Sequence, residues 1–437
     1  MAVWARRLRV QRFDHDASRS WRQLHSTSPF APDRRLFLKL SAAAASLAAC
    51  TPAPDSRKKH VAVIGGGIIG TSIAYHLAKQ GARVSLLERG RLAERASRGT
   101  FAWINATWAK QPRHYHAFNQ SGLSGWKRLQ SELDIPVRWG GSLEWFPSAE
   151  RQARLGEQIA EQVAWGEPAE MIGGERLAGL EPDVDFGAAD RVAYSPNDGA
   201  VDPVIAVHRL AEAAIRAGAV VRENCVAESV SESARGLSEL RTSCGPLLVD
   251  TYVLATGADP LATRNLAGLD IPQRTTPGVI VVTKPMPRLV NRIIVAPGVH
   301  IHQRDDGRVV LGEQDGAPDT AAHAERLQGR PNRFPAEIFA DQHASRIIAI
   351  AEQFVPGMRS AEIEDVFIGW RPLPIDGHPV LGRSPNQPRA YLAIMHSGVS
   401  LAPIVGQLVA AEIISETSAP DLDAYRPDRA FEAIRRY

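Results

Sequence analysis

A short apolar run, a glycine-rich turn and an amphipathic stretch follow one another near residue 60. The apolar run covers residues 60–64 and has the length and composition of a buried strand. The turn GGGIIG occupies residues 65–70, and an amphipathic helix pattern extends from there to about Gln80. A second apolar run, residues 83–87, closes on Glu88. This order predicts a strand–turn–helix–strand unit.

Further along the chain, both kinds of hydrophobic period recur. Residues 250–258 form an apolar strand pattern that ends in a Thr-Gly turn. Residues 276–313 contain two alternating patterns typical of strands, and residues 401–416 have apolar positions at helical spacing. Residues 318–345 are polar with helical stretches, which indicates a surface excursion. The chain therefore mixes strands and helices, as α/β proteins do.

The glycine-rich turn has the composition of a dinucleotide-binding site. Gly65 permits the tight turn, Gly67 lets a pyrophosphate approach the backbone, and Gly70 allows the helix to pack on the strand. The helix N-terminus offers N–H groups and the positive end of its dipole to phosphates. Glu88 lies 23 residues after Gly65 and can accept hydrogen bonds from ribose hydroxyls. FAD and NAD both use such a unit, and the predicted contacts are Gly65, Gly67, Ile69, Gly70, Glu88 and Arg89.

Motifs spread over residues 60–414 favour FAD. They are DTYVLATGA, GGSLEWFPSAER, SPNDGAVDPVIAVHRLAEAAIRAGAVVRENCVAESV, GRVVLGEQD, IGWRPLPIDGHPVLGRSP and AYLAIMHSGVSLAPIVGQLVAAEII. Together they resemble the FAD-dependent oxidoreductases of the D-amino-acid oxidase, glycine oxidase and sarcosine oxidase family. The resemblance implies an α/β fold, with a Rossmann-like FAD-binding domain and a discontinuous α+β substrate domain built on an antiparallel sheet. No Cys lies where some sarcosine oxidases link covalently to flavin, so we expect FAD to be held noncovalently, with covalent attachment to a His as the alternative.

The same resemblance implies where the two domains lie along the chain. The FAD-binding domain is expected to use residues 58–112, 198–275 and 364–437. The substrate domain is expected to use residues 113–197 and 276–363.

Three residues are predicted to act on the substrate. Arg371 matches the family's arginine that binds the substrate carboxylate, and a planar guanidinium suits that bidentate contact. The alternative is a structural Arg371 paired with a local carboxylate such as Asp376. The resemblance implies that His396 lies along the flavin ring. The alternative is that His396 caps the helix or only packs against its neighbours. His300 is expected where relatives place a Tyr near the substrate.

The resemblance also extends the cofactor site. Ser97 and Arg98 are predicted partners of the pyrophosphate, and Trp103 and Asn105 either pass near the flavin or only pack their loop. The loop before the C-terminal helix is expected to stabilise negative charge on the reduced flavin through backbone N–H groups and the helix end. The remaining predicted contacts are Val226, Ala255, Gly257, Gly398, Val399, Ser400 and Leu401.

Histidine and cysteine positions suggest structural roles. His300 with His302, and His114 with His116, have the spacing of ligand pairs, but no third ligand accompanies either, so we predict no metal site. Cys225 and Cys244 each lie near an apolar run. We predict two buried, unpaired thiols, with a disulfide between them in an oxidising compartment as the alternative.

The N-terminal segment resembles an export leader. The pair Arg34-Arg35 precedes an apolar, Ala-rich stretch that ends at Cys50, which resembles a twin-arginine signal followed by a lipobox. A chance Arg pair before a helix is the alternative. Residues 1–49 are therefore expected to be a signal peptide, and residues 50–57 a tether from a lipid anchor at Cys50. We expect the protein on the periplasmic side of a bacterial membrane.

Charge supports the same division of the chain. Residues 1–49 hold nine Lys and Arg against three Asp, a net charge of +6, so the remainder carries −3 of the overall +3. The basic character belongs to the leader, and we expect no nucleic-acid partner.

The predicted function is FAD-dependent oxidation of a small carboxylate-bearing amine: a D-amino acid, glycine or an N-methyl amino acid. Hydride passes to flavin N5 and the imine product is hydrolysed. The electron acceptor is oxygen or a quinone. Two alternatives remain open, a non-catalytic FAD-containing binding or assembly protein and an NAD-dependent dehydrogenase.

Overall fold

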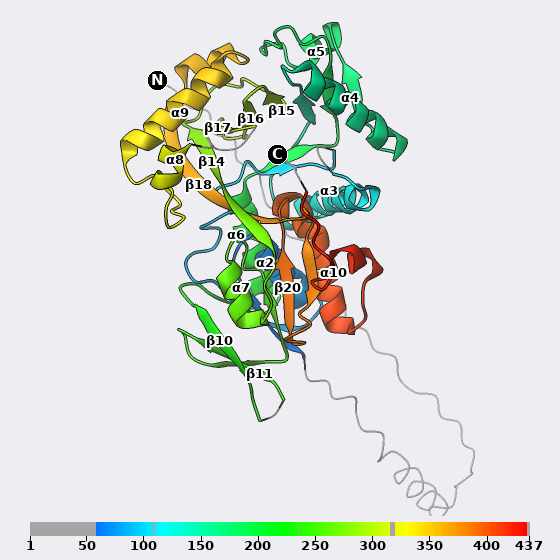
Figure 1. Cartoon of the computed structure of the whole chain (residues 1–437), viewed down its shortest axis with the longest axis vertical. Coiled ribbons are helices and arrows are strands. Elements are labelled where there is room, and N and C mark those ends of the chain that lie inside the picture. Colours follow the sequence, from blue (N-terminus) through cyan, green and yellow to red (C-terminus); the bar gives the residue numbers. More distant parts are fainter. Residues whose placement is uncertain (1–57, 108–109, 235, 315–319, 435–437) are drawn as a thin grey trace, which may run out of the picture. The chain divides into compact units, whose positions relative to one another are not determined.

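Two large sheets organise the protein (Figure 1). The computed structural model describes residues 58–107, 110–234, 236–314 and 320–434 of the 437. The predicted leader, the tether and the anchor at Cys50 lie outside the described residues and stay predictions.

The first sheet has six strands and is mostly parallel. The apolar run at residues 60–64 forms β1, all of whose residues are buried because both faces of the sheet are covered: Val61 and Val63 lie in one hydrophobic core, and Ala62 and Ile64 lie in another. Strand β19 alone pairs antiparallel, with β20. In spatial order the strands are β19 (Val380–Arg383), β20 (Ala390–Ile394), β13 (Thr251–Leu254), β1 (His60–Ile64), β2 (Arg83–Leu87) and β9 (Val220–Arg222).

The second sheet has eight strands and is mostly antiparallel, apart from the parallel pair β15–β5. Its two long strands pair so that Thr276 lies opposite Arg371 and Ile280 opposite Phe367. In spatial order the strands are β18 (Ile363–Pro374), β14 (Gln273–Thr283), β17 (Val309–Gly312), β16 (Val299–Gln303), β15 (Ile293–Ala296), β5 (Ser142–Glu144), β7 (Val192–Ser195) and β6 (Glu170–Ile172).

Two small sheets complete the strands. One contains β3 (Trp103–Ile104), β8 (Gly199–Val201) and β4 (Val137–Trp139), and the other contains β10 (Ala227–Glu232), β11 (Ser238–Thr242) and β12 (Leu247–Val249).

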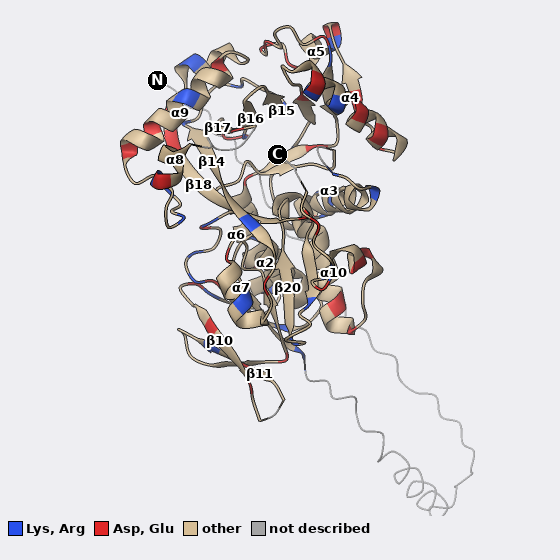
Figure 2. Cartoon of the chain, viewed as in Figure 1, with Lys and Arg blue, Asp and Glu red and all other residues tan. Residues whose placement is uncertain are grey.

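Local sequence explains where several helices begin. The carboxylate of Asp202 caps α6 by accepting from the N–H groups of Val204 and Ile205, and Pro203 occupies the first turn. The helices are α2 (Ile68–Lys79), α3 (Arg113–Leu133), α4 (Ala149–Ala164), α5 (Glu175–Leu180), α6 (Pro203–Arg216), α7 (Pro260–Ala267), α8 (Ala321–Arg326), α9 (Glu337–Glu352) and α10 (Gly398–Ser415). Short 3-10 helices cover Pro356–Ser360 and Pro420–Tyr425. Acidic and basic residues are mixed on α4 and α9 (Figure 2).

Helix α10 is the most apolar of the long helices. Among the described residues it is the single helix long and apolar enough to cross a membrane, yet 67% of it is buried inside the protein. It packs on α2 and α3. Tyr391 and Arg426 bind the Glu412 carboxylate near its C-terminal end. These contacts are those of a core helix.

The six-stranded sheet has a hydrophobic core on each face, and the eight-stranded sheet has a third core. Helices α2 and α10 pack in the first, α7 and the β10–β12 sheet pack in the second, and α9 covers the third. Tyr115 and Trp126 of α3 belong to the first core, although residues 113–197 are predicted to form the substrate domain. Strands β14 and β18 also cross the predicted boundaries. The predicted domain boundaries therefore stay a prediction. Side-chain packing would assign α3 to the FAD-binding domain.

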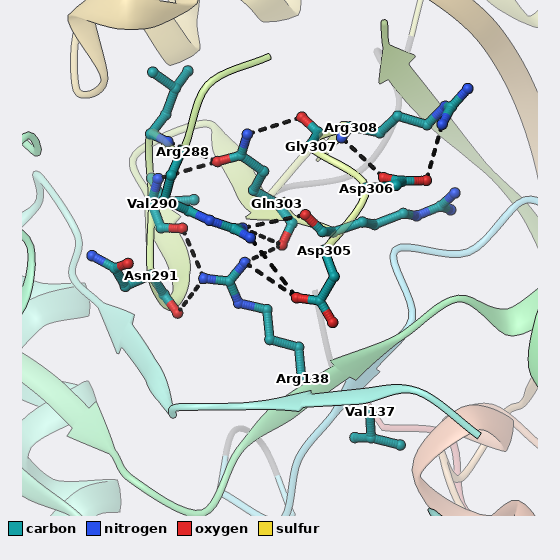
Figure 3. A network of polar contacts seen from close by, with 12 residues as sticks. Val137, Arg138, Arg288, Val290, Asn291, Gln303, Asp305, Asp306, Gly307 and Arg308 are labelled. Atoms are coloured by element: carbon teal, nitrogen blue, oxygen red, sulfur yellow. Dashed lines mark hydrogen bonds and ion pairs between the residues drawn. The ribbon is translucent and has the colours of Figure 1, made fainter. Parts of the chain in front are cut away.

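A polar network connects the small β4 sheet to the eight-stranded sheet (Figure 3). The guanidinium of Arg138 donates to the carbonyl oxygens of Gln303 at 2.7 Å, Asn291 at 3.0 Å and Val290 at 3.1 Å. The Gln303 side-chain amide donates in turn to the carbonyl of Gly307 at 2.9 Å. Arginine suits this place because its fixed fork of donors satisfies several buried carbonyls at once.

Candidate active site

A cavity of about 560 Å³ is lined by residues of both large sheets. Its size falls within the range of small-molecule and cofactor sites. Most residues predicted from the sequence line it. These are Gly65, Gly67, Ile69, Glu88, Arg89, Ser97, Val226, Ala255, Gly257, His300, Arg371, His396, Gly398, Val399 and Ser400.

The glycine-rich turn forms a backbone cradle at one end of this cavity. Gly65 has a φ of +112°, and a Cβ there would lie 2.3 Å from the carbonyl oxygen of Ala255. A Cβ on Gly70 would lie 1.8 Å from the carbonyl oxygen of Gly65. Gly70 therefore provides helix packing without lining the cavity. The Ser97 hydroxyl accepts a hydrogen bond from the N–H of Ile68 at 2.9 Å, which fixes the start of α2.

An acid lies at the end of β2, as the spacing predicts. The Glu88 carboxylate accepts from the N–H groups of Gly66 at 2.6 Å and Gly90 at 2.9 Å. Arg89 forms an ion pair with Asp259 at 2.6 Å beside it. Glu88 therefore lies at the cavity wall, in the position from which an acid binds the ribose of a dinucleotide.

Two predicted cofactor contacts lie elsewhere. Arg98 pairs with Asp365 at 3.0 Å and lies over the Phe367 ring, so it faces the second sheet and not the pyrophosphate site. Leu401 is fully buried within α10. Besides Arg89, the cations that line the cavity include Arg91, Arg95 and Arg330. Arg91 and Arg95 could have been found in the sequence, because they belong to the basic run RGRLAER directly after Glu88.

The segment around Arg330 connects the eight-stranded sheet to the loop that follows β13, near the glycine-rich turn. The Arg330 guanidinium donates to the carbonyl oxygen of Ala258 at 3.3 Å. Asn332 bonds the backbone of Ile368, and the Trp370 indole donates to the carbonyl of Pro331 at 2.9 Å. The segment predicted as a surface excursion thus contributes to the cavity wall.

The start of α10 forms a positively charged part of the wall. Ser397 adopts a left-handed conformation, with φ 58°, directly before the first helical residue. The buried Lys110 ammonium donates to the Ser397 hydroxyl at 2.9 Å. The Ser400 hydroxyl accepts from the N–H of Asn105 at 3.1 Å and so ties the β3 loop to the helix. A helix N-terminus and a lysine together favour an anionic group here. Lys110 carried no motif that would have identified it from sequence.

Arg371 belongs to β18 and lines the cavity from the second sheet. Its guanidinium donates to the carbonyl of Pro277 at 2.9 Å, which fixes its orientation. Asp376 pairs with Arg429 at 2.8 Å. Asp376 therefore pairs with Arg429 and not with Arg371, while a structural Arg371 paired with another local carboxylate stays the alternative.

The two histidines of β16 pack against the Phe101 ring, and His300 lines the cavity. His300 lies 5.3 Å from the Phe101 ring and 6.0 Å from the Trp103 ring, measured between centroids. His302 bonds the carbonyl of Phe101 at 2.9 Å, and burial lowers its pKa to about 3, so it is neutral at physiological pH. The described residues contain no group of three or more His, Cys, Asp or Glu that could hold a metal.

A buried carboxylate positions Trp103. The Asp198 side chain accepts from the Trp103 indole at 2.9 Å and from the Ser142 hydroxyl at 2.7 Å. Burial raises the pKa of Asp198 to about 7. Asp198 therefore fixes an aromatic wall residue while itself titrating near neutrality.

The two cysteines of the described chain differ from the prediction. Cys225 is buried and lines the cavity, whereas Cys244 is exposed, so the prediction that both are buried is wrong for Cys244. Both thiols are free in the structure.

The cavity fits a dinucleotide cofactor. A Cβ at Gly65 or Gly70 would clash with backbone and displace the glycine-rich turn, while Gly257 has nothing within 4 Å of an added Cβ. Backbone N–H groups, Ser97 and the arginines suit the pyrophosphate, and Glu88 suits a ribose. The start of α10 suits a ring that gains negative charge.

Comparisons with known proteins agree with this geometry. The model of the family described as FAD dependent oxidoreductase matches residues 60–412. Glycine oxidase of Bacillus licheniformis is 28% identical over 385 residues, covering 86% of this chain and 98% of that one. An opine oxidase subunit of Agrobacterium tumefaciens is 25% identical over 384 residues, covering 84% and 96%. The crystal structure of glycine oxidase from Geobacillus kaustophilus superposes with a TM-score of 0.75 at 24% identity, covering 86% and 100%. The predicted fold class is confirmed.

Proposed function

Because the chain belongs to the family of FAD-dependent oxidoreductases, we propose that it oxidises a small amine that carries a carboxylate. The observation that supports this most directly is Arg371, whose fixed guanidinium lines the same cavity as the cofactor cradle. A carboxylate is the group that pairs best with a planar guanidinium. The relatives named as glycine oxidase and opine oxidase support the same class of substrate.

Residues of this chain would bind and orient the reactants. Arg371 holds the carboxylate, and the aromatic wall of Phe101, Trp103 and His300 limits the size of the rest of the substrate. Such positioning supplies much of the rate enhancement, because it removes the entropy of bringing two reactants together. Bound FAD supplies the hydride acceptor, its N5 atom. The start of α10 and Lys110 would favour negative charge on the bound flavin.

The overall chemistry balances with water and an electron acceptor. A C–H bond next to nitrogen loses hydride, and the resulting imine reacts with water. The products are an oxo-acid and ammonia, or formaldehyde and a demethylated amine. Oxygen or a quinone takes the two electrons. The cellular location in which the protein meets this electron acceptor is part of the proposal.

We place the protein on the periplasmic side of a bacterial membrane, on the strength of the Arg34-Arg35 and Cys50 motifs. Fractionation of cells that express the full chain tests this. Cys50→Ala should release the mature protein from the membrane, and Arg34→Lys with Arg35→Lys should retain it in the cytoplasm. An unchanged distribution in both variants would refute the location without touching the proposed chemistry.

The proposed reaction is tested by anaerobic absorption spectroscopy of the purified holoprotein. A panel of D-amino acids, glycine, sarcosine and proline is added in turn, and bleaching of the flavin bands identifies the substrate. Analysis of the products for ammonia or formaldehyde then distinguishes deamination from demethylation. A yellow protein that no member of a broad amine panel bleaches would instead support a non-catalytic FAD-containing protein.

A further inference from the structure

Two thiols meet beside the cofactor end of the cavity. The Ser243 N–H donates to the Val226 carbonyl oxygen at 2.9 Å, which extends the antiparallel pairing of β10 with β11 by one residue pair. Cys225 and Cys244 come next on the two segments, at facing positions where cross-strand side chains contact each other. The Cys225 thiol donates to the Thr242 Oγ1 at 3.6 Å, and the same oxygen accepts from the Cys244 N–H at 3.1 Å. The two cysteines therefore converge on one hydroxyl.

The two thiols differ in their access to solvent. Cys225 is 1% exposed, whereas Cys244 lies on the surface. Burial raises the pKa of the Cys225 thiol, and its hydrogen bond with the Cys244 thiol raises this pKa further. Because the thiolate is the nucleophile and must be reached, Cys244 is the thiol that a dissolved oxidant meets first.

The segment that carries Cys225 is bonded to the cofactor wall of the cavity. The Cys225 N–H donates to the backbone carbonyl oxygen of Glu88 at 2.8 Å. Cys225 and Val226 line the cavity together with Glu88, the acid placed to bind a ribose. On its other side, the Val226 N–H donates to the Ser243 hydroxyl at 2.9 Å. Hydrogen bonds therefore join this part of the wall to the turn that follows β11.

Oxidation of this pair would replace hydrogen bonds with a covalent bond at the cofactor wall. We propose that Cys225 and Cys244 form a disulfide clasp that retains bound FAD, with a small disulfide as the oxidant. The Cys244 thiolate attacks one sulfur of this oxidant, and a first small thiol leaves. The Cys225 thiolate then attacks the Cys244 sulfur, and a second small thiol leaves. Two protons and two electrons thus pass from the cysteines to the oxidant, and one S–S bond replaces another.

The clasp should act on both FAD release and stability. It fixes residues 225 and 226 in the conformation that lines the cavity, so the wall loses less freedom when FAD binds. It also closes a loop of about 20 residues, which lowers the entropy of the unfolded chain. FAD that binds while the thiols are reduced would then be retained after they are oxidised. The periplasm, proposed above as the location, is an oxidising compartment in which this can occur.

Oxidised and reduced samples of the full-length holoprotein test the proposal. One sample is treated with glutathione disulfide and the other with dithiothreitol, and the reagents are then removed. Tryptic digestion of the oxidised sample should give peptides 223–235 and 242–264 joined by a disulfide, as detected by mass spectrometry. FAD release, followed by flavin fluorescence, should be about fivefold slower in the oxidised sample, the scale of fixing one or two side chains. The urea midpoint of the oxidised sample should be higher.

Two variants separate the clasp from other effects of oxidation. Cys244→Ser removes the exposed thiol, which is not among the residues that line the cavity. Both treatments of this variant should release FAD at the rate of the reduced wild type. Cys50→Ala is the matched control, because it removes the third cysteine of the chain and keeps the pair. It should show the same difference between treatments as the wild type.

The outcomes separate this inference from the proposed function. If oxidation gives no linked peptides, the pairing of the two thiols is refuted. Linked peptides without slower FAD release would refute the clasp, and so would a difference between treatments that persists in Cys244→Ser. None of these measurements uses an amine, so the proposed function stands if the clasp fails. If no amine reduces the flavin, the proposed function fails and the test of the clasp keeps its meaning.

Discussion

The two walls of the cavity recognise their ligands in different ways. The wall built on the six-stranded sheet presents backbone: Gly65, Gly67 and the N–H groups at the start of α2 and α10. The wall built on the eight-stranded sheet presents side chains, among them Arg371 and His300. Backbone recognition allows few residue types at each position, whereas side-chain recognition can be changed one residue at a time. The first wall therefore determines the cofactor, and the second determines the substrate.

The largest effect is expected from displacing the glycine-rich turn that forms the cradle. In Gly70→Val, the new side chain would meet the carbonyl oxygen of Gly65, which cannot move without displacing β1 from α2. We expect purified Gly70→Val to contain no FAD or to be insoluble. Flavin absorbance per mole of protein measures this. Gly156→Ala in α4 is the control, since nothing lies within 4 Å of its added Cβ. Full FAD content in Gly70→Val would contradict the role of the cradle.

A change on the other wall should separate substrate from cofactor. Arg371→Ala should retain FAD but lose about 10²-fold in the rate of flavin reduction by a carboxylate-bearing amine, the scale for removing one partner of a desolvated charge pair. Arg371→Lys should recover only part of this rate, because an ammonium cannot form the bidentate contact. Stopped-flow reduction under anaerobic conditions measures both. Loss of FAD in Arg371→Ala, with activity retained after reconstitution, would reverse the assignment.

Asp198 should make stability depend on pH. Its folded-state pKa of about 7 lies above the usual value of 3.8, so the folded protein binds the extra proton between those values. Stability from this group is therefore present at low pH and is lost as pH rises toward about 7. Asp198→Asn keeps an acceptor for Trp103 and removes the titration. The free energy of unfolding of Asp198→Asn, relative to that of the wild type, should therefore increase as pH rises through that window. Urea denaturation at a series of pH values measures this difference. A constant difference would contradict the buried-acid account.

The smallest effect is expected where sequence and structure disagree. Arg98→Ala should leave FAD affinity unchanged, because Arg98 pairs with Asp365 outside the cavity. Arg95→Ala should weaken FAD binding by about tenfold, the scale of a hydrogen bond to a charged group. Fluorescence titration of the apoprotein with FAD compares the two. If Arg98→Ala weakens FAD binding more than Arg95→Ala does, the prediction from sequence that Arg98 contacts the pyrophosphate would be supported.

The same difference between the walls explains what sequence could predict. The cradle is contiguous, because a strand, a tight turn and a helix must follow one another within one unit. Its residues, including Glu88, could therefore be found from spacing alone. The start of α10 was found through a motif, although the helix begins at Gly398, earlier than its apolar period indicates.

The substrate wall depends on contacts between distant segments. Gly312 and Arg371 reach one cavity through the pairing of β17, β14 and β18, which no local pattern specifies. Lys110 and Arg330 reach the cavity from loops, where side-chain direction follows from tertiary packing. Arg98 was misplaced for the same reason, since it turns toward Asp365, 267 residues away in the chain.

The central claim is that one wall holds FAD while the other orients a carboxylate-bearing amine toward it. The most direct test is anaerobic flavin reduction in the purified holoprotein by matched pairs of compounds, each an amino acid and the amine left after its decarboxylation. We predict that one amino acid bleaches the flavin and that its decarboxylated partner does so at least about 10²-fold more slowly, as loss of the Arg371 contact requires. Equal reduction by both members of every pair would contradict the claim.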